Sequence, residues 1–395
     1  MTDCIVVLNC GSSSIKFALF DAAQLPLPRT PVWSGKVEGI GTAHPTATEA
    51  GAPAQAVELD TAQPYHAALL HIRQRVEHML GNRRLVAVAH RVVHGGAKYF
   101  APVRVDAEVL ADLRSYIPLA PLHQPFALEA IEALLSELPE VPQVACFYTA
   151  FHHTLPQVEM MLPLPYAAWE RGLRRYGFHG LSYEYMSIVL PERHGDIARG
   201  RTIVAHLGSG ASLCAMRGLE SVATTMGFSA LDGLMMGTRC GALDPGAVLY
   251  LMETEHLSPA QVGHVLYHES GLLGVSGVSS DPRDLLAQEA DNPRVQAALA
   301  LYVRRIVREI GALVAVLGGL DLLVFTAGIG EHNAVLRERI VRALGYLGAD
   351  LNDAANQAHA AILSSSASRI RVAVEPTNEE WVAAQHGARC VRGRG

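Results

Sequence analysis

The sequence predicts an α/β protein made of two domains that repeat one plan. A chain of 395 residues, half of them hydrophobic, is longer than a single hydrophobic core usually needs, so two domains are expected. An apolar strand, a small Gly/Ser loop and a second apolar strand follow one another over residues 6–20. The same succession returns over residues 202–213, about half the chain further on, and aligning the two brings Gly11 opposite Gly208. Two such hairpins, one at the start of each half, indicate two similar domains that face one ligand.

Composition excludes several classes of protein. The net charge of −6 and a pI near 6.3 argue against a nucleic-acid or anionic-membrane partner. Six scattered cysteines without a Cys-x-x-Cys pair suggest neither a zinc site nor a disulfide framework, and reduced thiols in the cytoplasm are the simplest interpretation. Asp3 without a basic stretch does not resemble a signal peptide, and the most apolar segment, 310–325, is too short to span a bilayer.

The first hairpin contains polar groups suited to an anion. Gly11 lets the backbone approach a ligand closely, the three serines after it offer hydroxyl and N–H donors, and Lys16 adds a point charge. The chain has 29 arginines and only three lysines (Lys16, Lys36 and Lys98), which hints at a specific role for Lys16. A Gly/Ser hairpin by itself is more often a surface turn, so other segments have to decide between the two interpretations.

Further along the first half, elements alternate between helix and strand. Apolar spacing predicts helices over 66–80 and 127–138 and buried strands over 85–93 and 144–147, whereas 26–51 is expected to form strands and loops at the surface. Arg91, near the end of the second strand, is either a surface charge or an anion clamp. The histidine pair 152–153 is more typical of a loop or core than of a zinc site. His179, between glycines, is either a turn residue or a donor to a charged intermediate.

In the second half, glycine-rich loops follow strand ends. The loop 227–241 contains Arg239 among its glycines, and a long helix is expected from Asn292-Pro293. The buried strand 320–325 leads into a Gly-x-Gly segment and a helix over 333–344, an arrangement that directs backbone N–H groups at phosphate or ribose. Glu379 follows the strand 371–374 and is either a ligand for a hard cation or a solvated carboxylate at a helix start.

Together these parts describe a nucleotide–metal cleft between two α/β domains. Arg91, His179 and Arg239 lie on separate loops and supply positive or donor groups, which is what phosphoryl transfer chiefly requires. Neither a Gly-x-x-x-x-Gly-Lys-Ser/Thr loop nor the protein-kinase motif set occurs, so those two architectures are disfavoured.

Six ordered motifs resemble the acetate kinase family over essentially the full length. They are Leu8-Asn9-Cys10-Gly11-Ser12-Ser13-Ser14-Ile15-Lys16-Phe17, the segment 90–96, Arg175-Tyr176-Gly177-Phe178-His179-Gly180, the loop 226–241, the segment 326–331 and the segment 376–380. The resemblance implies two duplicated ribonuclease-H-like domains of the acetate and sugar kinase/Hsp70/actin superfamily, with the nucleotide between them. It also implies a homodimer and the reversible reaction ATP + acetate ⇌ ADP + acetyl phosphate, dependent on Mg²⁺ or on Mn²⁺ in its place. We expect domains at 1–147 with 381–395, and at 148–380.

The resemblance also assigns roles to residues by their matching positions. Asn9 and Glu379 match the magnesium site, His179 and Arg239 the pair that stabilises the transferring phosphoryl group, and Arg91 the residue that binds the substrate carboxylate. Val93, Leu122 and Ala230 fall where the family lines its acyl pocket. The expected nucleotide contacts are Ser12, Ser14, Lys16, His206, Leu207, Gly208, Ser209, Gly210, Asp281, Pro282, Arg283, Gly328, Ile329, Gly330, Glu331 and His332.

The chain departs from the family at one position of consequence. Tyr148 stands in Phe147-Tyr148-Thr149-Ala150-Phe151-His152 where the family has its active-site Asp. A phenol with a pKa of about 10 is uncharged at neutral pH and is a poor ligand for a hard cation, so a slowed reaction is expected. Smaller departures are Ser209, His332 and Ala230 in place of the common Asn, Asn and Pro.

Three alternatives to an acetate kinase follow. Ala230 widens the acyl pocket and favours a propionate-preferring kinase, since one methylene is worth only ~1–3 kcal/mol of discrimination. Tyr148 favours a catalytically impaired nucleotide-binding protein. A sugar kinase or an Hsp70-like ATPase shares the fold but should lack the loops of Arg91 and His179.

Overall fold

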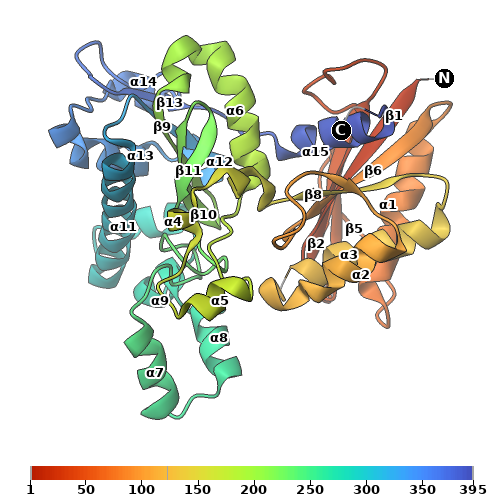
Figure 1. The fold of residues 1–395 in the computed structure, drawn as a ribbon, viewed down its shortest axis with the longest axis horizontal. Helices are drawn as coiled ribbons and strands as arrows, with labels where there is room; N and C mark the ends of the chain where they lie inside the picture. Colours follow the sequence, from red (N-terminus) through yellow and green to blue (C-terminus); the bar gives the residue numbers. More distant parts are fainter. Residues whose placement is uncertain (1, 122, 394–395) are drawn as a thin grey trace. The chain divides into compact units, whose positions relative to one another are not determined.

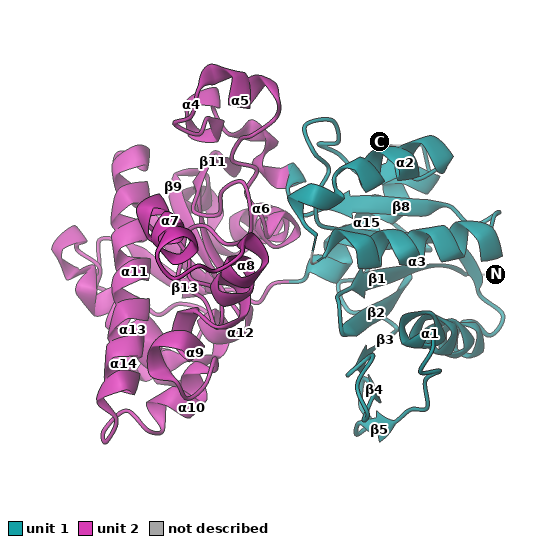
Figure 2. Cartoon of the chain, turned by 90° about the horizontal axis from the view of Figure 1, so that it is seen from below, with its two compact units in different colours: residues 1–150, 378–395 teal, residues 151–377 magenta. Residues whose placement is uncertain are grey.

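The computed structural model describes residues 2–121 and 123–393, which form two compact units. Unit 1 comprises residues 1–150 and 378–395, and unit 2 comprises residues 151–377 (Figure 2). The domains expected from the sequence differ from these units at residues 148–150 and 378–380, which here belong to unit 1. Tyr148 and Glu379 are therefore in the same unit.

Unit 1 contains an eight-stranded sheet with the order β5-β4-β3-β2-β1-β6-β8-β7. Strands β1, β2 and β3 are antiparallel neighbours, whereas β1, β6 and β8 run parallel. The strands are β1 (Asp3–Cys10), β2 (Ser14–Asp21), β3 (Trp33–Glu38), β4 (Thr46–Glu49), β5 (Gln55–Ala56), β6 (Arg84–Val92), β7 (Val103–Arg104) and β8 (Gln143–Phe147). The helices are α1 (Pro64–Leu80), α2 (Ala107–Ser115), α3 (Gln124–Glu137) and α15 (Glu379–Val391), with a 3₁₀ turn at Ile117–Leu119.

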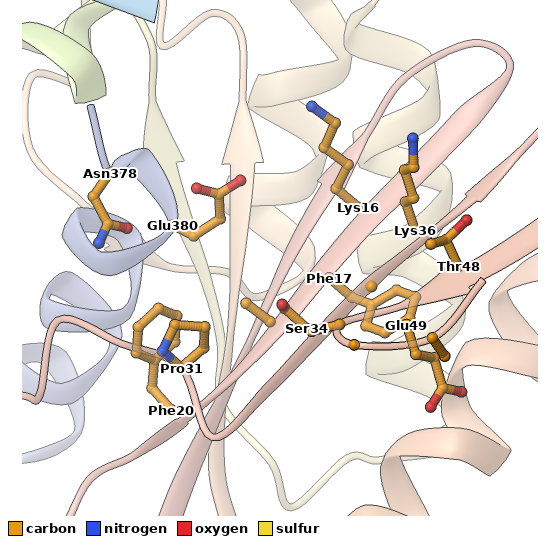
Figure 3. A pocket seen from close by; sticks show the side chains of 15 residues that line it. Lys16, Phe17, Phe20, Pro31, Ser34, Lys36, Thr48, Glu49, Asn378 and Glu380 are labelled. Atoms are coloured by element: carbon orange, nitrogen blue, oxygen red, sulfur yellow. The ribbon is translucent and has the colours of Figure 1, made fainter. Parts of the chain in front are cut away.

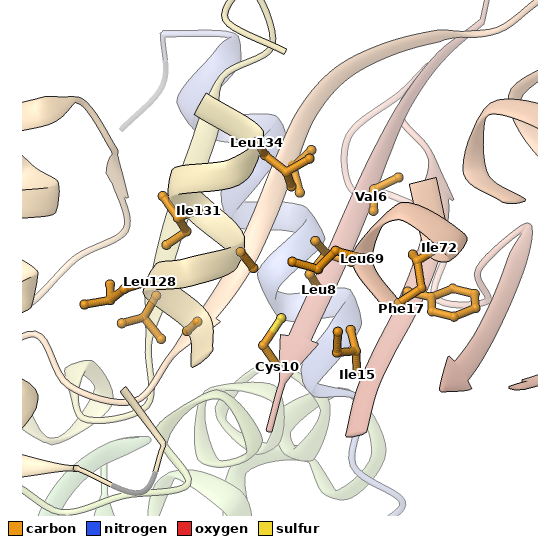
Figure 4. Packing of buried hydrophobic residues seen from close by; sticks show 14 of the residues in the cluster. Val6, Leu8, Cys10, Ile15, Phe17, Leu69, Ile72, Leu128, Ile131 and Leu134 are labelled. Carbon is orange, nitrogen blue, oxygen red and sulfur yellow. The ribbon is translucent and has the colours of Figure 1, made fainter. Parts of the chain in front are cut away.

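Successive side chains of β1 point to opposite faces of this sheet, and helices cover both faces. Leu8 and Cys10 pack with Leu69 of α1 and Ile131 of α3 in one buried cluster (Figure 4). On the opposite face α15 lies against β1 and β6. Its Gly387 packs on this face, where an added Cβ would lie 3.4 Å from Ile5 and from Ala89, at ordinary van der Waals distance.

Unit 2 contains a five-stranded sheet with the order β11-β10-β9-β12-β13. Its first three strands are antiparallel and its last three parallel, as in the β3-β2-β1-β6-β8 part of unit 1. The strands are β9 (Arg201–Leu207), β10 (Ala211–Arg217), β11 (Glu220–Thr224), β12 (Leu322–Thr326) and β13 (Arg371–Val374). The same order and directions in both sheets confirm the predicted duplication.

Helices make up most of the rest of unit 2 (Figure 1). They are α4 (Gln157–Met160), α5 (Tyr166–Glu170), α6 (Gly180–His194), α7 (Pro245–Glu253), α8 (Pro259–His268), α9 (Gly271–Ser276), α10 (Pro282–Leu286), α11 (Pro293–Leu317), α12 (Ala327–His332), α13 (Ala334–Ala343) and α14 (Asp353–Gln357). Shorter 3₁₀ turns lie at Ala150–Thr154, Gly195–Arg199 and Gly345–Leu347. No described helix is both long and apolar enough to cross a bilayer.

The long helix α11 begins where the sequence predicts. The Asn292 side chain accepts hydrogen bonds from the backbone N–H groups of Arg294 and Val295, and Pro293 occupies the first turn. Gly318 ends the helix at φ 71°, a conformation that glycine adopts without a Cβ penalty. The Gly-x-Gly segment differs from its prediction, because Gly328 and Gly330 lie inside the short helix α12 and not in a loop before a helix.

Candidate active site

In unit 1 three candidate residues lie at the same edge of the sheet. Asn9 is near the end of β1, Arg91 near the end of β6, and Tyr148 directly after β8. These strands are parallel neighbours, with Leu8 opposite His90 and Val92 opposite Phe147, so their carboxyl ends meet. Glu379, the first residue of α15, joins them from the C-terminal segment.

Arg91 contacts two other members of this group, Asn9 and Tyr148, and its Nε–H makes no hydrogen bond among the described residues. Its Nη1 donates to Asn9 Oδ1 at 2.6 Å, and its guanidinium carbon lies 3.7 Å from the centre of the Tyr148 ring. The Nε of Arg91 is buried and has no hydrogen-bond partner among the described residues. A buried N–H without a partner is costly, so this site favours an acceptor supplied by a ligand.

Tyr148 is a neutral hydrogen-bond donor in this structure. Its hydroxyl donates to Glu379 Oε2, and the side chain is buried. Burial raises the pKa of Tyr148 well above its ordinary value, the nearby Glu379 raises it further, and Arg91 only partly opposes both. One oxygen of Glu379 therefore accepts a hydrogen bond from the Tyr148 hydroxyl.

Glu380 and the first hairpin complete the surroundings in unit 1. Burial raises the pKa of Glu380, as does the charge of Glu379, while Lys16 and Arg91 lower it. Lys16 lies directly opposite Asn9 across the β1–β2 pair and is exposed. The hairpin turn is closed by Gly11 N, which donates to Ser14 O at 2.8 Å, and it leaves Ser12 exposed.

In unit 2 the structure brings His179 beside Arg239. His179 precedes α6 at φ 57°, a left-handed conformation that is uncommon for a residue other than glycine. A Cβ added to Gly210 would lie 3.4 Å from His179 Nε2 and 2.8 Å from Arg239 Nη2. A nitrogen atom from each side chain therefore borders the space that a side chain at residue 210 would occupy.

Neighbouring side chains fix the ring of His179. Its Nδ1 is 2.8 Å from Ser212 Oγ, which is also 2.5 Å from Tyr183 Oη. Its ring stacks on His206 with centres 4.1 Å apart, and His206 Nδ1 is 2.9 Å from Ser182 Oγ. Since Nδ1 of His179 is engaged by Ser212, Nε2 is the nitrogen that borders Gly210.

The predicted nucleotide segments of unit 2 lie close to one another. Strand β12 runs parallel to β9, with Thr326 opposite His206, so α12 starts beside the 206–210 turn. A Cβ added to Gly237 would lie 3.2 Å from Ser280 O and 3.7 Å from Ser209 O, which brings the segment 281–283 near that turn. Arg283 is exposed and ion-pairs with Asp281 at 2.5 Å, and the side chain of His332 is also exposed.

Two predicted residues have structural contacts of their own. Glu331 Oε1 accepts the backbone N–H of Ala327 at 2.8 Å and that of Thr377 at 3.2 Å. Ala327 has φ 64°, so Glu331 stabilises a strained residue at the start of α12. Arg239 Nη1 donates to the carbonyl of Ala230 at 3.0 Å, which fixes the backbone of that predicted acyl-pocket residue.

The three predicted acyl-pocket residues belong to different parts of the chain. Val93 is buried in unit 1, Ala230 belongs to unit 2, and Leu122 lies outside the described residues.

Sequence reasoning missed Arg337 of α13. This side chain is 1% exposed and donates to Gly330 O at 2.9 Å, to Glu331 O at 2.8 Å and to Asn356 Oδ1 at 2.9 Å. Burial lowers the pKa of Arg337 to about 10. It therefore holds the last turn of α12 in place. Its position on the buried face shared with Ile340 and Val341 was the signal available in the sequence.

The described residues offer too few ligands to hold a divalent cation by themselves, so a bound nucleotide would have to supply the others. Within 2–121 and 123–393 no group of three or more His, Cys, Asp or Glu side chains could hold a metal ion. Asn9 and Glu379 offer hard oxygen donors, and magnesium commonly binds one or two such side chains together with substrate phosphates and water. Asn9 and Glu379 suit that role, although each already accepts a hydrogen bond within the protein.

The chain is similar to known proteins over nearly its full length. The model of the acetokinase family matches residues 4–385. An acetate kinase of Rhodopseudomonas palustris is 48% identical over 391 residues, covering 98% of both chains, and one of Methylocella silvestris is 47% identical over 399 residues, covering 98% of this chain and 97% of the relative.

Solved structures of similar proteins share the whole fold. The Porphyromonas gingivalis acetate kinase superposes with a TM-score of 0.86 at 35% identity, covering 98% of each chain. A propionate kinase from Francisella tularensis gives 0.88 at 33% identity, covering 97% of this chain and 98% of its own. These likenesses confirm the expected fold of the actin, Hsp70 and sugar kinase type. The chain belongs to the acetokinase family and is a phosphotransferase of the acetate kinase type.

Proposed function

We propose that this protein transfers the γ-phosphoryl group of ATP to acetate, giving ADP and acetyl phosphate, and also catalyses the reverse reaction. A carboxylate oxygen of acetate attacks the γ-phosphorus while the bond to the β–γ bridging oxygen breaks. The observation that supports this most directly is the buried Nε of Arg91, which has no partner among the described residues. A carboxylate is the acceptor that a guanidinium fork binds best.

The same proposal assigns the unit 2 residues to the transferring group. His179 Nε2 and Arg239 Nη2 border one space above Gly210, where two donors would oppose the charge on the equatorial phosphoryl oxygens. Ser212 keeps the His179 ring in that orientation. We assign the nucleotide contacts to Lys16, Ser12 and Ser14, to the segments 206–210 and 281–283, and to residues 328–332.

We further propose Mg²⁺, or Mn²⁺ in its place, as the cation. Asn9 and Glu379 would hold it together with the nucleotide phosphates, whose negative charge it would neutralise when bound. Tyr148, kept neutral by its raised pKa, adds no charge to this site. The reaction is therefore slower than it would be with a carboxylate at residue 148.

Replacing Tyr148 tests this assignment. We expect Tyr148→Asp to raise the rate of acetyl-phosphate formation by about 10- to 100-fold, the range typical for residues that tune a metal site. The gain should appear only at high magnesium, because without the cation two adjacent carboxylates would share a proton. Formation of acetyl phosphate is measured against magnesium concentration for both proteins.

Tyr148→Phe is the matched control. It keeps a ring beside Arg91 and removes the hydroxyl that donates to Glu379, and it should not reproduce the gain of the Asp variant. Equal rates for the unaltered protein and Tyr148→Asp at saturating magnesium would contradict the assignment. ATP binding without any transfer would support a nucleotide-binding protein instead.

A propionate preference is the second candidate function. Ala230 stands where Pro is common, and a propionate kinase is among the structures similar to this chain. One extra methylene changes discrimination by only ~1–3 kcal/mol, so both acids would be used. The ratio of kcat/KM for propionate and acetate decides between them.

For assembly and location we propose a homodimer in the cytoplasm. The six cysteines are all free, and Cys4, Cys10, Cys146 and Cys214 are buried, which suits a reducing compartment. Sedimentation equilibrium of the purified protein measures the proposed dimer.

A further inference from the structure

Unit 1 has an open groove of about 510 Å³ beside the first hairpin. Its floor and walls come from β2, β3 and β4, and Asn378 and Glu380 border it from the start of α15 (Figure 3). Gly35 forms part of the floor, where an added Cβ would lie 2.5 Å from the Phe17 ring and from Thr48 O. The floor of the groove therefore has no room for a side chain at residue 35.

Two of the chain's three lysines line this groove as direct cross-strand neighbours. Lys16 of β2 is paired with Lys36 of β3, and the same row continues to Asn9 on one side and Thr48 on the other. Figure 3 shows both ammonium groups at the same end of the groove. Like charges directly opposite each other destabilise a sheet pair, and an anion bound beside both ammonium groups would relieve this repulsion.

The acidic side chains near Lys16 and Lys36 neutralise only part of the positive charge of these two lysines. Lys36 ion-pairs with Glu38 at 2.7 Å, and both side chains are at least 40% exposed. Lys16 makes no ion pair within the described part of the chain. Glu380 faces Lys16 from the opposite wall of the groove. Glu49 also lines the groove but is bound by Arg75 at 2.6 Å.

We propose that this groove binds a polyphosphate chain, with Lys16 and Lys36 as its two cations. The proposal rests on the proposed function, because it extends the nucleotide contact assigned to Lys16. Lys36 is thus a further phosphate-binding residue, and the Thr48 hydroxyl lies next to it in the same row. The ligand class is a nucleoside di- or triphosphate, or inorganic pyrophosphate, which has the same chemistry.

Titration calorimetry with inorganic pyrophosphate tests this site on the full-length protein. We expect Lys36→Gln to raise the Kd for pyrophosphate about tenfold, the loss typical of one hydrogen bond to a charged group. Lys36→Arg should retain binding. Glu38→Gln, which frees Lys36 from its ion pair, should lower the Kd.

Lys98→Gln is the matched control. Lys98 is the third lysine of the chain and ion-pairs with Asp112 outside the groove, so its variant should bind pyrophosphate like the unaltered protein. Undetectable pyrophosphate binding by the unaltered protein, or equal Kd values for Lys36→Gln and Lys98→Gln, would overturn the proposal.

Comparison of ATP and AMP separates this inference from the proposed function. Lys36→Gln should weaken ATP binding and leave AMP binding unchanged if the lysines bind the polyphosphate chain. If the protein does not phosphorylate acetate but binds pyrophosphate in a way that depends on Lys36, the proposed function is refuted and the proposed site stands. If the protein phosphorylates acetate and Lys36→Gln leaves ATP binding unchanged, the proposed site is refuted and the proposed function stands.

Discussion

Arg91 contacts two different chemical groups, and each limits its freedom in a different way. Asn9 accepts a hydrogen bond from one of its N–H groups, the Tyr148 ring lies against its plane, and its buried Nε has no acceptor among the described residues. A planar guanidinium held on one edge and one face presents its remaining edge in a fixed direction. The orientation proposed for the substrate carboxylate thus depends on geometry as well as charge.

Arg91→Lys should separate these two contributions. Lysine keeps the charge but has no planar fork, so we expect the KM for acetate to rise about tenfold or more while the KM for ATP changes little. Steady-state kinetics with each substrate varied in turn measures both values. An unchanged KM for acetate would show that Arg91 does not bind the carboxylate.

At this scale the sequence could predict which residues matter but not what they contact. Asn9, Arg91 and Glu379 were found from strand ends and motif positions, since parallel strands bring their carboxyl ends together. The hydrogen bond from Tyr148 to Glu379 joins residues far apart in the chain and depends on the packing of α15, which local patterns do not encode. The buried Arg337 was missed because a charged residue in a helix is normally interpreted as exposed.

The turn between β9 and β10 positions backbone next to two candidate site residues, His179 and Arg239. Gly208 N donates to Gly210 O at 3.0 Å, so the turn is tight and presents backbone beside His179 and Arg239. The equivalent turn between β1 and β2 is closed by Gly11 and Ser14. The strands around both turns were predictable from alternation, whereas the short helix α12 was not, because it depends on the Arg337 and Glu331 contacts.

Gly210→Ala should impair the site without unfolding the protein. The added methyl group would lie 2.8 Å from Arg239 Nη2, too close for the present arrangement, so the guanidinium has to move. We expect kcat to fall by about 10- to 100-fold, as when one transition-state donor is displaced, while the thermal midpoint changes by only a few degrees.

Gly263→Ala is a control for the effect of a methyl group alone. Gly263 lies within α8, and an added Cβ there would meet nothing within 4 Å. This variant should keep full activity and gain roughly 0.5–1 kcal/mol in stability from helix propensity. Parallel loss of activity in both variants would contradict a specific role for Gly210.

Across the whole molecule, buried histidines link stability to pH. His90 and His94 in unit 1 and His152 in unit 2 are at most 2% exposed, and burial lowers the pKa of each to about 4. Unfolded histidines bind protons below a pKa of about 6.5, so between pH 6.5 and 4 the unfolded state binds more protons than the folded state. Folding stability therefore falls as the pH is lowered through this window, and the raised pKa of Glu380 acts in the opposite sense.

We expect the thermal midpoint to fall when the pH is lowered from 7 to 5. Each buried histidine contributes up to about 1.4 kcal/mol per pH unit. Calorimetry at several pH values measures the slope, and His90→Gln should make it shallower, because glutamine does not titrate. Identical midpoints at pH 7 and pH 5 would contradict this account.

The position of α15 has a consequence for the order in which the molecule is built. Unit 2 is one continuous stretch, whereas unit 1 combines residues 1–150 with a helix that leaves the ribosome only after unit 2. Until that helix has been synthesised, β1 and β6 lack the helix that packs against one of their faces, and Tyr148 lacks its hydrogen-bond acceptor Glu379. Domains usually complete their folding in the order of synthesis. Here unit 2 can finish folding before unit 1, and the group around Arg91 is complete only after Glu379 has been synthesised.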